Sequence, residues 1–305
     1  MAGKRKIILT VAQTGNFQGK DKNPNLPEQA SEIIQSAYDC YNAGASIVHI
    51  HARDKQPRDK YGNSSNDPKV FAEINSGIRA KCNIITQNST APATHPGSDA
   101  DDGVVLLYDD SIRGALPEMC SLDTSLIDTV WMDLKFIYEW RRDWLIKQAN
   151  RMKELGIKPE IEVFNAESIE DVFYHLYPAG CLEDPVSLTL VMGMDRISQG
   201  AISYTQRNHD FMIDLVRDCS AAVGARNVDW STMAIAANQL PATVYGMLKG
   251  GGVRTGMEDN INYRYKELAV SNSQLVERMV KIIELMEYEV ATPDEAREIL
   301  NIKKR

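Results

Sequence analysis

The chain has 305 residues, of which 43% are hydrophobic and 25% are charged, as expected for a folded globular protein with one large domain or two modest ones. The formal net charge of −8 argues against a general nucleic-acid-binding surface. No apolar run approaches the roughly 18 residues of a membrane span. The five scattered cysteines form no CxxC pair and no secretory signal is visible, so we expect a reducing, cytoplasmic location.

Short apolar runs bounded by turn residues alternate with amphipathic runs along the chain, and they predict strands and helices respectively. The predicted strands are residues 6–13, 46–51, 83–87, 117–122, 160–164, 186–192, 228–234 and 251–256. The predicted helices are residues 28–42, 68–80, 99–107, 138–156, 168–176 (with a capping box from Ser168 to Asp171), 205–223, 240–248, 272–285 and 293–300. Residues 127–136 fit either an extended segment or the start of a helix.

This alternation repeats about eight times without a linker, which predicts a parallel sheet covered by helices. We therefore expect an α/β fold, a single-domain (β/α)8 TIM barrel over residues 1–305 with closing helices at its carboxyl end. The alternative is an open doubly wound sheet. No GxGxxG motif follows the first strand, so dinucleotide binding has no direct support.

Two histidines stand close together in the second predicted strand, within the run IVHIHARD. Side chains alternate along a strand, so His49 and His51 face the same side, about 7 Å apart along the backbone, and can bind one cation. Arg53 continues that face and Asp54 ends the strand. A structural role for the two imidazoles remains the alternative. His95, His175 and His209 fall in a loop or in helices outside the barrel and are left out of the site.

Polar residues collect after the predicted strands, at the end of a barrel where active sites form. Glu258 is our third metal ligand, because two histidines and a carboxylate leave positions open for substrate; its alternative role is to cap the next turn. Arg254 and Asp259 flank it, and an ionised Asp259 can act as a base. Ser89, Thr90 and the backbone N–H groups after them can hold a carboxylate, although ordinary turn chemistry explains them equally well.

The runs KIILTVAQTGN, AGASIVHIHARD, IITQNST, PEMCSLD and GGVRTGMEDN resemble the β-keto acid cleavage enzymes, in order and over nearly the whole chain. The resemblance implies one zinc ion per barrel, a homotetramer or other homo-oligomer, and conversion of a β-keto acid and acetyl-CoA into acetoacetate and a new acyl-CoA. His49, His51 and Glu258 match the zinc ligands, Asp259 the base, and Arg254 the residue that supports it. Ser89 matches a substrate contact, and Thr124, or its neighbour Asp123, falls near another.

The chain departs from the family pattern where the substrate would bind. Ala91-Pro92 replace a common Gly-Gly pair, and proline lacks an N–H group, so the carboxylate cradle must differ. Asn16-Phe17 stand where members with amino substrates carry an acid, which favours a neutral or apolar substrate tail. The alternatives to this function are a metal-dependent lyase, aldolase or hydrolase that uses no CoA, and a barrel that keeps zinc as a structural or sensing element.

Overall fold

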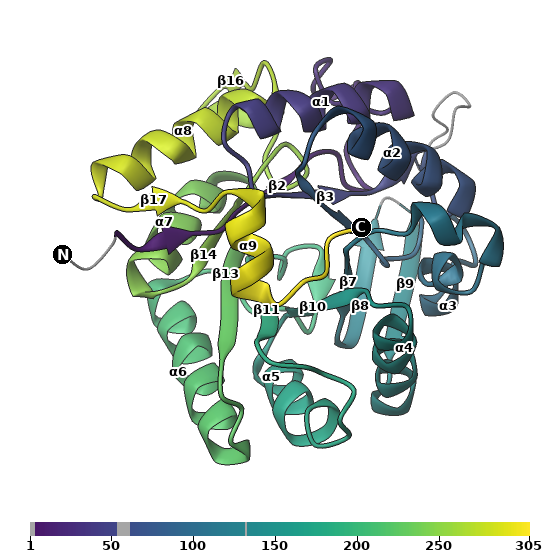
Figure 1. The fold of residues 1–305 in the computed structure, drawn as a ribbon, viewed down its shortest axis with the longest axis vertical. Helices are drawn as coiled ribbons and strands as arrows, with labels where there is room; N and C mark the ends of the chain where they lie inside the picture. Colours follow the sequence, from purple (N-terminus) through teal and green to yellow (C-terminus); the bar gives the residue numbers. More distant parts are fainter. Residues whose placement is uncertain (1–3, 54–61, 132) are drawn as a thin grey trace.

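The computed structural model describes residues 4–53, 62–131 and 133–305. Eight parallel strands pair into one closed barrel with helices around it, which confirms the predicted single-domain (β/α)8 barrel and rules out the open sheet (Figure 1). Around the barrel the strands are β2 (Leu9–Ala12), β3 (Ile47–Ile50), β6 (Ile85–Asn88), β7 (Met119–Asp123), β10 (Lys158–Val163), β11 (Val186–Met192), β13 (Val228–Ala234) and β14 (Gly252–Thr255). The last strand, β14, pairs with β2, so the barrel closes between the two ends of the chain.

Each long helix buries one apolar stripe against the barrel, as its spacing predicts. In α1, for example, Ile33, Ala37 and Cys40 are fully buried. The helices are α1 (Ala30–Asn42), α2 (Pro68–Lys81), α3 (Ala100–Gly103), α4 (Arg142–Glu154), α5 (Ala166–Asp171), α6 (Gln206–Val223), α7 (Gln239–Lys249), α8 (Asn272–Leu285) and α9 (Pro293–Leu300). No helix among the described residues is both long enough and apolar enough to cross a membrane.

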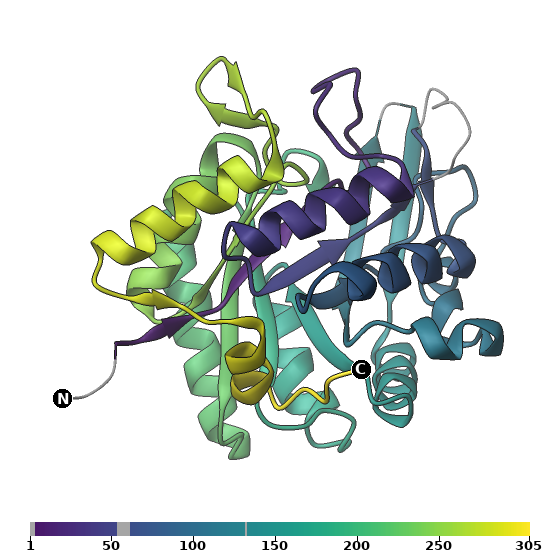
Figure 2. The same ribbon diagram turned by 45° about the horizontal axis from the view of Figure 1, so that its top comes forward.

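The last helix fills the amino-terminal end of the barrel. Leu300 of α9 shares a buried cluster with Ile47 and Ile85, which lie at the starts of their strands. Arg297 of α9 makes two hydrogen bonds, of 2.6 and 3.0 Å, to the carboxylate of Glu118. In Figure 2 the loops after β2 and β14 project away from α9. The open end of the barrel is therefore the carboxyl-terminal one, where the polar strand ends collect.

A β-hairpin beside the barrel replaces the ambiguous segment and part of a predicted helix. The hairpin consists of β8 (Ser125–Trp131) and β9 (Leu134–Trp140), and β12 (Ser198–Gln199) pairs with β8. The helix predicted from residue 138 therefore begins at Arg142 instead. Exposed and buried residues alternate along β9, and that period of two distinguishes it from a helix.

Several other boundaries also differ from prediction. The capping box predicted at Ser168 is wrong, because the side chain of Asn165 caps α5, which begins earlier and continues as a π-helical turn over Val172–Leu176. The helix predicted over 99–107 divides into α3 and a 3-10 turn. The remaining short pairs are β1 (Lys6–Ile7) with β17 (Glu289–Val290), β4 (Ala52–Arg53) with β5 (Ser64–Ser65), and β15 (Asn262–Arg264) with β16 (Glu267–Leu268).

One of the excluded histidines is more deeply buried than its predicted place implies. His209, predicted to lie outside the barrel, is on α6 but fully buried, with Nε2 2.9 Å from Thr232 Oγ1 of β13. Asp54, predicted to end the second strand, lies outside the described residues.

Candidate active site

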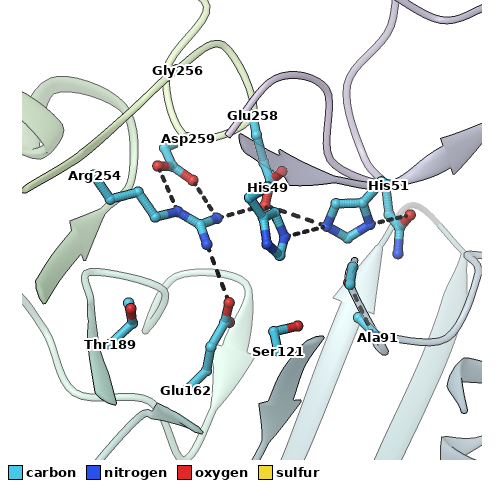
Figure 3. Close-up of polar contacts among 12 residues, drawn as sticks. His49, His51, Ala91, Ser121, Glu162, Thr189, Arg254, Gly256, Glu258 and Asp259 are labelled. Atoms are coloured by element: carbon cyan, nitrogen blue, oxygen red, sulfur yellow. Dashed lines mark hydrogen bonds and ion pairs between the residues drawn. The ribbon is translucent and has the colours of Figure 1, made fainter. Parts of the chain in front are cut away.

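Two histidines and a glutamate converge at the open end of the barrel (Figure 3). His49 lies on β3, His51 directly follows that strand, and Glu258 follows β14. These two strands flank β2, so their carboxyl ends are close together. The two Nε2 atoms are 3.2 Å apart, and Glu258 Oε1 lies 3.6 and 3.4 Å from those of His49 and His51. The structure thus brings together the three side chains predicted to bind a metal, with one ligand atom of each within 4.8 Å of the others.

Hydrogen bonds to amide oxygens determine which nitrogen of each ring carries the proton. Asn16 Nδ2 donates to the carbonyl of Pro92 at 3.0 Å, so it is Asn16 Oδ1 that faces His51 Nδ1, at 2.9 Å. His49 Nδ1 similarly lies 2.9 Å from Gln87 Oε1. Because an amide oxygen only accepts, both Nδ1 atoms donate and both Nε2 atoms present lone pairs.

Three electron-rich atoms therefore face one another. Burial lowers the pKa of His49 to about 3, so this ring is neutral near pH 7. Glu258 Oε2 is buried and has no hydrogen-bond partner among the described residues. Imidazole nitrogens and a carboxylate are the donor set that a divalent cation such as Zn²⁺ accepts, with coordination positions left for substrate. The residues present fit such an ion.

Arg254 connects the ligand group to two further carboxylates behind it (Figure 3). Its guanidinium donates to both oxygens of Asp259, at 3.2 and 3.0 Å, to Glu258 at 2.6 Å and to Glu162 at 3.2 Å. Asp259 is completely buried, and burial raises its pKa to about 6 against the opposing effect of Arg254. Asp259, expected to be an ionised base, is therefore ionised mainly above that pH.

Two glycines, which have no side chains, leave the space that Glu258 and its loop occupy. Gly15 has φ +61°, and a Cβ atom there would lie 2.7 Å from Cγ of Glu258. Gly256 has φ +134°, and a Cβ atom there would overlap the carbonyl oxygen of Ala12 at 1.9 Å. Glycine at these positions thus permits the close approach of the loops after β2 and β14.

A cavity of about 280 Å³ opens in front of the three ligands. Four of the predicted site residues line it: His49, His51, Ser89 and Glu258. The other four lie behind its wall: Thr90, Thr124, Arg254 and Asp259. The structure thus separates the predicted residues into four that line the cavity and four that lie against its lining.

The three predicted hydroxyl groups have different partners. Thr90 Oγ1 donates to the carbonyl of Ser121 at 2.6 Å, and Thr124 Oγ1 donates to a carbonyl of β10 at 2.7 Å. Ser89 Oγ instead accepts from the N–H of Ala91 at 3.1 Å and can still donate its own proton. The expected cradle of backbone N–H groups is therefore reduced, since Ala91 is engaged and Pro92 has no N–H.

Sequence reasoning missed the residues that support the ligands. Gln87, which orients His49, donates to Glu160 at 3.0 Å, and Glu162 binds Arg254. Glu160 and Glu162 stand at alternate positions of one buried strand, the same pattern that identified the two histidines, so the signal was available. The hairpin residues that line the cavity, such as Trp131, have no comparable signal, because their sequence fits an extended segment and the start of a helix equally well.

The chain is similar to known proteins over nearly its whole length. A profile of the beta-keto acid cleavage enzymes matches residues 6–302. The 3-keto-5-aminohexanoate cleavage enzyme of Acetoanaerobium sticklandii is 32% identical over 98% of this chain and 99% of its own. The 3-oxoadipate:acetyl-CoA acetyltransferase of Cupriavidus necator is 30% identical over 97% of this chain and 94% of its own. The apo structure of ObcA superposes with a TM-score of 0.72 at 18% identity over 92% of this chain, which spans 66% of that structure and supports the fold.

Proposed function

The chain belongs to the β-keto acid cleavage enzyme family, and on that basis we propose that it converts a β-keto acid and acetyl-CoA into acetoacetate and a new acyl-CoA. Relatives named as acetyl-CoA-dependent transferases support this class of carbon–carbon cleaving transferase. The observation that carries the proposal is the convergence of His49, His51 and Glu258 on the wall of a cavity.

We propose Zn²⁺ as the ion for this site, held by the two imidazoles and the carboxylate. The proposal of Zn²⁺ is supported by the two imidazole nitrogens and the carboxylate oxygen that face one another. When bound, such an ion supplies Lewis-acid polarisation of the substrate's carbonyl and carboxylate oxygens. Asn16 and Gln87 keep both rings in the tautomer that can bind it.

The remaining chemistry falls to side chains around the ligands. Ser89 can donate its hydroxyl proton to the substrate carboxylate from the cavity wall. Asp259 is our proposed base for the C2 proton, and a pKa of about 6 suits a base that works near neutral pH. Arg254 holds Asp259 by two hydrogen bonds and stabilises its charged form. Thr90 and Thr124 then support the strand ends that carry the site rather than binding substrate directly.

The reaction balances without a further reactant. Removal of the C2 proton gives an enolate, whose C2 attacks the acetyl carbonyl carbon. The CoA thiolate leaves that carbon and adds to the neighbouring ketone carbon, which carried the substrate's tail. The bond between C2 and C3 of the original acid then breaks, which releases the tail as acyl-CoA, and C2 regains a proton as acetoacetate forms.

The test is acetyl-CoA dependence. Purified protein supplied with Zn²⁺ and a set of β-keto acids should form acetoacetate and the matching acyl-CoA, detected by mass spectrometry, when acetyl-CoA is present. Equal cleavage of the acids without acetyl-CoA would identify a lyase, aldolase or hydrolase instead. Metal binding without turnover of any acid in the set would favour a non-catalytic barrel.

We also propose that the enzyme is a cytoplasmic homo-oligomer. Leu126, Val130 and Ile137 form an exposed apolar stripe on the outer face of the β8–β9 hairpin, a feature typical of interfaces between subunits. All five cysteines are free thiols, as in cytoplasmic proteins. Light scattering after gel filtration measures the subunit number directly, and a monomer would contradict the assembly.

A further inference from the structure

The half of the cavity that faces away from the metal ligands is formed largely by the β8–β9 hairpin. Ile127 pairs with Tyr138 across the hairpin, and Trp131 and Trp140 lie on the same inner face. All four side chains line the cavity. Intervening residues such as Val130 point outward and are exposed, because side chains alternate along a strand. The hairpin therefore presents a largely apolar wall, in which the hydroxyl of Thr129 is paired with that of Ser198, to whatever extends beyond the reacting carbons.

The rings of this wall are packed against one another. Tyr138 and Trp140 are stacked with centroids 5.1 Å apart, and Trp140 is stacked on Phe164 at 6.3 Å. Trp131 lies against Phe17 at 5.0 Å. A cation binds an aromatic ring through its face, and Trp140 already stacks with both Tyr138 and Phe164. This arrangement suits an apolar group better than a substituted ammonium group.

The cavity also offers little charge to a charged tail. None of the described residues that line it is lysine or arginine, so a second carboxylate would find no basic partner among them. Its two acidic wall residues outside the ligand group are Asp123 and Glu162. Glu162 is paired with Arg254 at 3.2 Å, and burial raises the pKa of Asp123 well above its ordinary value, which favours its neutral form. An ammonium group would thus meet a neutral Asp123 and a Glu162 that is already paired with Arg254.

We infer that the β-keto acid of this enzyme carries an uncharged, largely apolar tail beyond its ketone, lodged between Ile127, Trp131 and Trp140. This inference rests on the proposed function and specifies the substrate class. Trp131 Nε1 is buried and has no hydrogen-bond partner among the described residues, which leaves one unused donor in a largely apolar wall. The names of three relatives specify amino, second-carboxylate and trimethylamine-bearing compounds, whereas a fourth names 3,5-dioxohexanoate, whose tail is uncharged like the one inferred here.

Three acids of equal skeleton length separate the tail chemistries: 3-oxohexanoate, 5-amino-3-oxohexanoate and 3-oxoadipate. Their dissociation constants are measured by calorimetry on the Zn²⁺-loaded protein without acetyl-CoA, so that binding is read apart from turnover. We expect 3-oxohexanoate to bind about tenfold or more tightly than either charged acid, because each unpaired charge must lose its water in the cavity. Equal or tighter binding of either charged acid overturns the inference.

A pair of neighbouring variants then tests whether the hairpin holds the tail. Trp131→Ala should weaken 3-oxohexanoate binding about tenfold and leave acetyl-CoA binding unchanged, because it removes apolar contact with the tail. Lys135→Ala is the matched control, since Lys135 lies on the exposed outer face of the same hairpin, outside the cavity, and its change should alter neither. If Trp131→Ala weakens acetyl-CoA binding but not that of the acid, the wall serves the thioester and the inference is wrong.

Product formation distinguishes this inference from the proposed function. With acetyl-CoA present, 3-oxohexanoate should give acetoacetate and butyryl-CoA. Butyryl-CoA formation combined with tighter binding of a charged acid would refute the tail inference and leave the proposed function intact. The expected binding order without any acyl-CoA product would refute the proposed function, while the measured selectivity for apolar tails would stand.

Discussion

Gly15 lies against Glu258 so closely that a Cβ atom on the glycine would come within 2.7 Å of Cγ of the glutamate. The loop after the first barrel strand therefore determines where the carboxylate contributed after the last one can lie. This contact joins the loop after β2 to the loop after β14, at the point where the barrel closes and beside both histidines. The position of Glu258 thus depends on a residue that carries no functional group.

Gly15→Ala should lower zinc content and activity together, because the new methyl group displaces Glu258 from the two imidazoles. The residue also has φ +61°, so alanine there costs about 1 kcal/mol of backbone strain. Gly180→Ala is a matched control, since Gly180 has φ +72° and open space around its Cβ position. Metal analysis and thermal unfolding should show similar destabilisation in both variants but metal loss only in Gly15→Ala. Full zinc content in Gly15→Ala would contradict this account.

Removal of the metal should abolish turnover reversibly. Dialysis against a chelator is expected to inactivate the protein, and added Zn²⁺ should restore activity to the original level. Glu258→Gln should bind zinc about tenfold or more weakly, because it removes the anionic ligand. Glu267→Gln, which changes an exposed carboxylate on β16, serves as the control. Undiminished activity in metal-free protein would exclude the proposed role of the ion.

Asp259→Asn should reduce kcat by about a hundredfold or more with zinc content unchanged, if Asp259 removes the C2 proton. A base works in its deprotonated form, so kcat/KM of the unaltered enzyme should be full above the pKa of about 6 and fall as pH drops below it. The residual activity of Asp259→Asn should lack this acidic limb. A variant that keeps the limb would assign the titration to another group and leave Asp259 to position Arg254.

His209 should make the protein less stable in mild acid. Burial lowers the pKa of the folded His209 to about 4, whereas an unfolded histidine titrates near its ordinary value of 6.5. The unfolded state therefore binds more protons below pH 6.5, and stability present above that pH is lost as pH falls toward 4, by up to about 3 kcal/mol. Urea unfolding at several pH values measures this slope.

The matched variants for that measurement are His209→Asn and His175→Asn. The first should flatten the slope between pH 6.5 and 4, and the second should leave it unchanged because His175 is exposed. An unchanged slope in His209→Asn would show that other groups dominate the acid sensitivity.

Most of the barrel could be predicted because its signals are local. Apolar runs of strand length alternate with amphipathic helical runs, and residues such as Pro68 and Gly224 mark helix ends where the structure has them. The histidine pair was also predictable, since a period of two places both rings on one face. Adjacency of the first and last strands then follows from barrel closure and brings Glu258 to them.

The hairpin was harder to predict because two periods compete there. Its aromatic residues, among them Phe136, Tyr138 and Trp140, suit a helix as well as a strand. A single residue separates β9 from the helix that follows. The burial of Asp259 behind Arg254 could not be predicted either, because sequence spacing does not say which carboxylate faces the cavity. Partners from strands distant in sequence, such as Glu162, decide that arrangement.

The β8–β9 hairpin is inserted between β7 and α4 and contributes none of the three ligand side chains. Recognition and reactivity are therefore encoded in separate stretches of the chain. Mutation of the insert can change which acids are accepted while the machinery that makes and breaks carbon–carbon bonds stays intact. Substitutions in this hairpin can therefore change the substrate range of related barrels. The hairpin is the first segment to alter when the substrate specificity is redesigned.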